Sequence, residues 1–150
     1  MNIEEQLMIL LNVFIACMLT GLIGLEREKY DKPAGFRTSM LIGGGVALLT
    51  SLGKVIIIDF YNYFPADLID ADPTRIIQAI VVGISFIGAG TVLQLKTELE
   101  IKYLTTAAST IFSAGIGISI ALEQYILGVG STLLVLFIMY IVRVLKERFQ

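Results

Sequence analysis

Five apolar stretches, separated by short polar segments, make up most of this chain. They run over residues 7–25, 38–60, 76–95, 104–122 and 125–144. Each comes close to the ~20 residues that an α-helix needs to cross ~30 Å of hydrocarbon. A soluble helix would instead spread its charges along one face. We therefore predict an all-α polytopic membrane protein with five transmembrane helices, in which residues 1–150 form a single domain.

Charge is concentrated between the first two predicted spans. The apolar run stops at Leu25, and seven charged residues follow within the twelve positions from Glu26 to Arg37. A helix C-terminus disfavours anions, so Glu26 has two interpretations: an ion pair with a neighbouring base, or a carboxylate that binds a cation or a partner. We predict that Glu26, Arg27 and Arg37 form a charge network that fixes this loop against the base of the bundle.

Composition supports the membrane assignment and excludes several function classes. Apolar residues make up 56% of the chain and charged residues 16%, below the ~25% charged residues of typical soluble proteins. One cysteine and no histidine leave no zinc or haem site. Hydroxyl residues have no evident base beside them, which argues against hydrolase chemistry. We expect a protein that is not an enzyme, has no cofactor and binds no nucleic acid.

Lysine and arginine are unequally divided between the two sides of the predicted bundle. Nine lie in the first loop, the third loop and the C-terminal tail, whereas the opposite side has only Lys54 and Arg75. Cytoplasmic loops are enriched in these residues. We therefore predict an external N-terminus and a cytoplasmic C-terminus. The acidic first residues are unlike the basic start of a signal peptide, so no cleaved leader is expected.

The third span begins with a recognisable helix-start pattern. Asp72 followed by Pro73 places a capping side chain before a proline, as at many helix N-termini. The interpretations of Asp72 are a simple cap or a functional charge acting with Arg75, an ionisable residue near the membrane boundary that needs a partner. Asp67, Asp70 and Asp72 could hold magnesium through water, and a solvated acidic loop is the alternative.

Small residues recur at helical spacing and predict close helix packing, as in many membrane proteins. On the second and fourth spans they recur at every fourth position. The residues that we assign to packing are Gly21, Gly24, Ser39, Gly43, Ala47, Gly83, Gly88, Gly90, Ser109, Ser113 and Gly117. For Gly88 and Gly90, a broken transport helix is the alternative.

Several of these features occur as motifs in one order along the chain. The motifs are Gly21-x-x-Gly24-x-Glu26-Arg27, Lys32-Pro33-Ala34-Gly35-Phe36-Arg37-Thr38, Asp72-Pro73-x-Arg75, Gly83-Ile-x-Phe86-Ile-Gly88-Ala89-Gly90 and Leu104-Thr105-Thr106-Ala107-Ala108. In these motifs the chain resembles the MgtC/SapB family over roughly residues 7–140. Because the chain stops at Gln150, the cytoplasmic domain of longer members is expected to be missing.

The resemblance implies a five-span protein of the plasma (inner) membrane of a bacterium or archaeon. It links the chain to growth at low magnesium and, in pathogens, to survival inside host cells. Some members restrain the F-type ATP synthase. The implied function is adaptation to low magnesium and regulation of membrane energetics through a membrane partner such as that synthase, with the lipid bilayer and a second copy as further partners. The alternative is a transporter or channel for magnesium or another cation.

Overall fold

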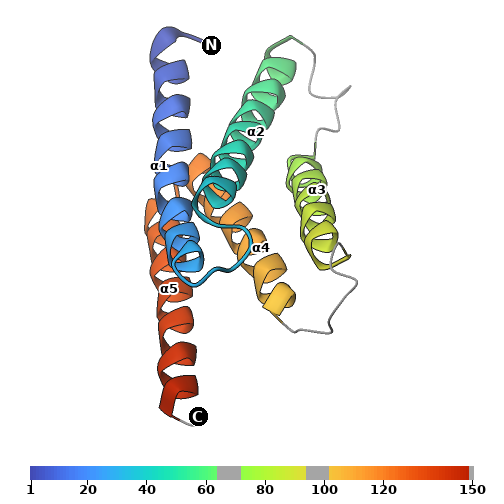
Figure 1. Cartoon of the computed structure of the whole chain (residues 1–150). Helices are drawn as coiled ribbons and strands as arrows, with labels where there is room; N and C mark the ends of the chain where they lie inside the picture. Colours follow the sequence, from blue (N-terminus) through green and yellow to red (C-terminus); the bar gives the residue numbers. More distant parts are fainter. Residues whose placement is uncertain (64–71, 94–101, 149–150) are drawn as a thin grey trace.

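The computed structural model of the chain is a bundle of five α-helices (Figure 1). It describes residues 1–63, 72–93 and 102–148. The helices are α1 (Ile3–Glu28), α2 (Phe36–Tyr63), α3 (Thr74–Leu93), α4 (Lys102–Ala121) and α5 (Tyr125–Arg148). Each is long and apolar enough to cross a membrane. The all-α, five-span prediction is therefore confirmed, and the orientation stays a prediction.

The ends of α1 and α2 extend beyond the predicted apolar spans. Asn2 caps α1, and its side chain accepts a hydrogen bond from the backbone of Glu5, whose carboxylate bonds back to the Asn2 amide. This reciprocal capping box satisfies two amides at the helix start. α2 runs through Lys54 as far as Tyr63. Lys54 interrupts the apolar run in the sequence. It does not end the helix, because its long side chain can reach polar surroundings.

The bundle is built around α4, which contacts all four other helices. Half of its span is buried, compared with 11% of the span of α3. The approach to α2 is close enough that a Cβ added at Gly117 would lie 2.4 Å from the carbonyl oxygen of Gly43. Only a residue without a side chain fits there. Packing of this kind holds membrane helices together where lipid removes the hydrophobic drive.

Several hydroxyl side chains inside the bundle donate hydrogen bonds within their own helices. Thr20 donates to the carbonyl of Ala16 at 2.7 Å on α1, and Ser113 donates to that of Ser109 at 3.0 Å on α4. Thr132 forms the same kind of bond on α5. The hydrogen-bonding demand of these buried groups is met without a partner on another helix. Small polar residues therefore serve here mainly to let helices approach closely.

Candidate functional site at the charged loop between α1 and α2

Seven residues connect the end of α1 to the start of α2 and reverse the direction of the chain. Two of them, Asp31 and Ala34, have left-handed backbone conformations with φ of 50° and 56°. The carboxylate of Glu28 accepts a hydrogen bond from the amide of Phe36 at 2.8 Å. An anion thus satisfies the first free amide of α2, where the helix dipole favours it. Glu28, at the end of α1, therefore caps α2 and holds the loop between the two helices.

Glycine lets this loop fold back against α1. A Cβ added at Gly24 would lie 2.7 Å from both the carbonyl oxygen of Gly35 and the Cα of Phe36. One added at Gly21 would lie 2.9 Å from the Phe36 ring. The contact at Gly24 is with backbone, which cannot move aside as a flexible side chain can. The predicted packing glycines of α1 therefore lie where they position the loop.

Arg27 joins the loop to α4 and is fully buried. Its Nε and Nη2 atoms donate to the carbonyl oxygen of Pro33 at 3.0 and 2.8 Å. Nη1 donates to the carbonyl of Thr105 at 3.4 Å, and Nη2 also donates to the hydroxyl of Thr106. A buried guanidinium needs such partners because desolvation disfavours its charge. Its several fixed donors suit it to bridging the two segments.

Glu26 joins the same region to α5. Its Oε1 atom lies 3.0 Å from Nη2 of Arg143, and Arg143 also donates to the Tyr30 hydroxyl. The Arg143 guanidinium lies 4.2 Å from the centre of the Tyr30 ring and 5.6 Å from that of Tyr140, within the range of cation–π attraction. The other carboxylate oxygen, Oε2, is buried with no hydrogen-bond partner among the described residues. Glu26 thus keeps capacity to accept a hydrogen bond from a water molecule or to bind a cation.

The predicted network of Glu26, Arg27 and Arg37 is wrong in its partners. Glu26 contacts Arg143, and Arg27 contacts carbonyls and a threonine. Arg37 is exposed on the first turn of α2 and makes no ion pair with any residue that the structure describes. Because i and i+1 positions on a helix point to different sides, Glu26 and Arg27 reach different neighbours. Sequence reasoning missed Arg143. Its position as an arginine near the end of an apolar span is the signal that could have identified it.

Asp72 and Arg75 lie at the start of α3, away from this loop. The Asp72 carboxylate accepts hydrogen bonds from the hydroxyl and the amide of Thr74 at 2.6 and 2.9 Å. These bonds, with a smaller contribution from the positive charge of Arg75, lower the pKa of Asp72 below its usual value. Both charged side chains are exposed. The structure places Asp72 as a helix cap in contact with solvent.

The proposed magnesium ligands Asp67 and Asp70 lie outside the described residues. Among the residues that are described, no three acidic, histidine or cysteine side chains are grouped closely enough to hold a metal ion.

Most of the predicted packing residues lie at helix contacts. Ser39, Ala47, Ser109 and Ser113 are buried, with Gly43 and Gly117, in the α2–α4 region. A Cβ on Gly88 would touch Ala107 of α4 at 3.4 Å. Gly83 and Gly90 differ from the expectation, because a Cβ on either would meet no described atom within 4 Å. Both point away from the α3–α4 contact.

The model of one protein family, the MgtC family, matches residues 13–148. The chain belongs to the MgtC family. YhiD of Escherichia coli (strain K12), which is named as a candidate magnesium transporter, is 34% identical over 93% of this chain and 62% of its own length. Protein MgtC of Salmonella typhimurium (strain LT2) is 32% identical over 97% of the chain and 58% of its own length. The chain thus spans about three fifths of these MgtC-family relatives. No solved structure matches it significantly.

Proposed function

We propose that this MgtC-family protein is a non-enzymatic protein of the inner membrane that supports adaptation to low magnesium. It would do so by regulating membrane energetics through a membrane partner such as the F-type ATP synthase. The main support comes from the hydrogen bonds of the polar groups inside the bundle, which join parts of this chain to one another. Among the described buried residues, Arg27 is the one with a charged side chain, and its donors bind the loop and α4.

A transport pathway requires polar groups that face a cavity near the middle of the membrane. In the described part of the bundle, buried hydroxyls such as Thr110 and Ser113 bond to carbonyls of their own helix. Their hydroxyl protons are thus used within the helix, and the described residues group no three acidic, histidine or cysteine side chains that could hold a metal ion. This favours a regulator over a transporter, and the fixed charged loop is the surface that we expect the partner to contact.

Cation transport is the second candidate, and one feature favours it. The buried Oε2 atom of Glu26 has no partner among the described residues, and a carboxylate oxygen is a ligand that magnesium accepts. YhiD carries a name that points in the same direction.

Two measurements separate the candidates. Purified protein in proteoliposomes loaded with a magnesium-sensitive dye should show no more Mg²⁺ entry than empty liposomes. Growth at low magnesium should be restored when the chain is expressed in a bacterium that lacks its own MgtC-family protein, with an accompanying fall in ATP synthesis by inverted membrane vesicles. A Mg²⁺ flux that Glu26→Gln abolishes would replace the regulator with the transporter.

The charge of Asp72 is part of this proposal, together with that of Arg75. Asparagine caps helices about as well as aspartate, so Asp72→Asn removes the charge and retains the cap. We expect the Asn variant to insert normally and fail to restore growth at low magnesium. Full growth with Asp72→Asn, and failure only with Asp72→Ala, would limit Asp72 to capping.

A further inference from the structure

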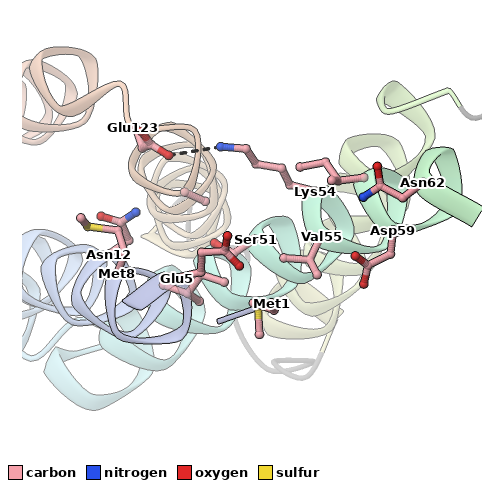
Figure 2. A pocket seen from close by; sticks show the side chains of 13 residues that line it. Met1, Glu5, Met8, Asn12, Ser51, Lys54, Val55, Asp59, Asn62 and Glu123 are labelled. Carbon is pink, nitrogen blue, oxygen red and sulfur yellow. Dashed lines mark hydrogen bonds and ion pairs between the residues drawn. The ribbon is translucent and has the colours of Figure 1, made fainter. Parts of the chain in front are cut away.

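A groove of about 410 Å³ opens between α1 and α2 (Figure 2). It lies at the end of α1 opposite the charged loop (Figure 1). The two helices spread apart toward the N-terminus of α1 (Figure 1). The residues that line the groove recur at helical spacing on each of them. Glu123, in the turn between α4 and α5, adds a third side. Because the two helices spread apart, they leave a pocket at this end, whereas the rest of the bundle is closely packed.

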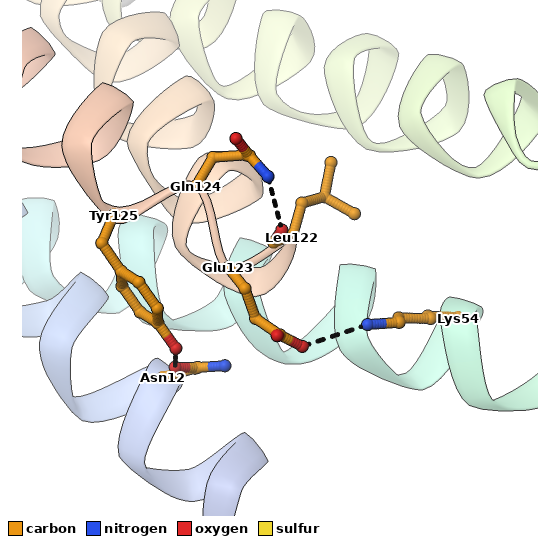
Figure 3. Close-up of polar contacts among 6 residues, drawn as sticks. All are labelled: Asn12, Lys54, Leu122, Glu123, Gln124 and Tyr125. Atoms are coloured by element: carbon orange, nitrogen blue, oxygen red, sulfur yellow. Dashed lines mark hydrogen bonds and ion pairs between the residues drawn. The ribbon is translucent and has the colours of Figure 1, made fainter.

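The walls of the groove are apolar and its floor is polar. Met8, Ile9, Val55 and Ile58 line the walls, and Asn12 is only 3% exposed at the floor. The Asn12 Oδ1 atom accepts a hydrogen bond from the Tyr125 hydroxyl at 2.9 Å (Figure 3). The amide NH2 group of Asn12 has no acceptor among the described residues. Because Asn12 lines the groove, a ligand with an acceptor atom can take a hydrogen bond from this NH2 group.

Charges of both signs surround the mouth. Lys54 lies 3.1 Å from Glu123, and about half of each side chain is exposed. The carboxylates of Glu5 and Asp59 also line the groove. Lys54 is eighteen residues from the start of α2, a rise of about 27 Å, which is close to the thickness of the hydrocarbon layer. The mouth therefore lies at the depth of lipid headgroups.

We propose that this groove binds the headgroup of a zwitterionic aminophospholipid. The primary ammonium group pairs with the carboxylates of Glu5 and Asp59. The phosphate oxygens accept hydrogen bonds from Lys54 and from the Asn12 amide. The glycerol and the first acyl methylenes contact the apolar walls, which a hydrated metal ion would leave unused.

The chemistry of the mouth distinguishes between lipid classes. An anionic lipid without an amine leaves the two carboxylates facing a negative charge. A choline lipid has a quaternary ammonium that cannot donate hydrogen bonds to them. Phosphatidylethanolamine has both groups that the groove needs. Free phosphoethanolamine has the same polar groups without the acyl chains, so it tests whether the ligand is a lipid.

Lipid binding to the purified protein can be measured by native mass spectrometry from detergent. Phosphatidylethanolamine, phosphatidylcholine and phosphatidylglycerol are each added at the same mole fraction, and soluble phosphoethanolamine in a parallel series. We expect phosphatidylethanolamine to bind about tenfold more tightly than the other two lipids, the scale of one charge-assisted hydrogen bond. Equal binding of all three lipids, or equal binding of phosphoethanolamine, would overturn the proposal.

Matched variants on α1 test the site itself. Glu5→Gln removes one carboxylate from the groove and keeps the capping box, which accepts Gln at this position. Glu4→Gln removes an adjacent exposed carboxylate that does not line the groove. Glu5→Gln and the exposed variant Asp59→Asn should each weaken phosphatidylethanolamine binding severalfold, whereas Glu4→Gln should not. Equal weakening by Glu4→Gln, or none by Glu5→Gln and Asp59→Asn, would contradict the assignment.

Discussion

The two ends of the bundle hold charged residues in different ways. At the loop end, the Glu26–Arg143 pair has a separation of 3.0 Å, with side chains 14% and 26% exposed. At the groove end, the Lys54–Glu123 pair has nearly the same separation, 3.1 Å, but both side chains are at least half exposed. Exposed pairs contribute little because water screens them, whereas buried charges require compensation. The N–O distance therefore does not tell which ion pair contributes more to stability, whereas the burial of the side chains does.

The largest expected effect is the loss of Arg27 at the loop end. Arg27→Leu removes the donor to the carbonyls of Pro33 and Thr105 and to the hydroxyl of Thr106. The Thr106 hydroxyl is fully buried, and the loss of its partner costs about 1–3 kcal/mol. We expect a marked fall in the thermal unfolding midpoint in detergent. Lys54→Leu is the matched control at the groove end and should leave the midpoint nearly unchanged. Equal midpoints for both variants would remove the contrast between the ends.

The next effect is steric and concerns Gly24. Gly24→Ala places a Cβ against the backbone of Gly35 and Phe36, and overpacking of this kind costs about 1–3 kcal/mol. Gly45→Ala is the control, because a Cβ there meets no described atom within 4 Å. Protease access to Lys29 and Lys32 should rise in the Gly24 variant and stay constant in the Gly45 variant. Unchanged access at Gly24→Ala would show that the loop can move away without cost.

A smaller difference is expected between the two ion pairs. Glu26→Gln weakens a partly buried charged hydrogen bond, with an expected cost of about 1–2 kcal/mol. Glu123→Gln acts on an exposed pair and should change stability by no more than about 0.5 kcal/mol. Denaturant titrations of both variants at low and at high salt measure the difference. Salt should reduce the effect of Glu123→Gln more strongly, and the reverse order would contradict the argument from burial.

The smallest effect is the pH dependence of the Asp72 cap, which lies at the same end as the groove. Its pKa is lowered in the folded protein. The carboxylate therefore stabilises the start of α3 above its ordinary pKa of about 4, and this contribution is lost as the pH falls through the lower folded value. Hydrogen exchange at the Thr74 amide, corrected for its intrinsic rate, should accelerate on acidification. Asp72→Asn should remove that dependence, and an unchanged profile would exclude the carboxylate as its origin.

Much of the fold could be predicted from the sequence because its signals are local. Five apolar runs of spanning length, the Asp72 cap and the recurrence of small residues on α2 and α4 each depend on nearby positions. The packing of Gly117 against Gly43 follows from such a recurrence. Gly83 and Gly90 have the same residue type on α3 but face open space. The sequence identifies a small residue, but only the arrangement of the helices determines whether that residue lies at a helix contact.

The charged loop was harder to predict because its partners are distant in sequence. Arg27 and Thr106 are 79 residues apart, and Glu26 and Arg143 are 117 apart. The sequence favours pairing of Glu26 with the bases beside it, and nothing local indicates α4 or α5. The groove was not predicted either, since it depends on how far α1 and α2 diverge.

The contacts of Arg27 also bear on how the protein is assembled during synthesis. Ribosomes deliver α1 and α2 to the membrane well before α4. The Arg27 guanidinium can therefore bond to Thr105 and Thr106 only after α4 has been synthesised. Glu26 waits still longer, because Arg143 is in the last helix. The first hairpin therefore inserts with an unfinished turn that later helices complete. A truncation after α3 should yield inserted helices α1–α3 with the α1–α2 turn incomplete, which quality-control proteases recognise and remove.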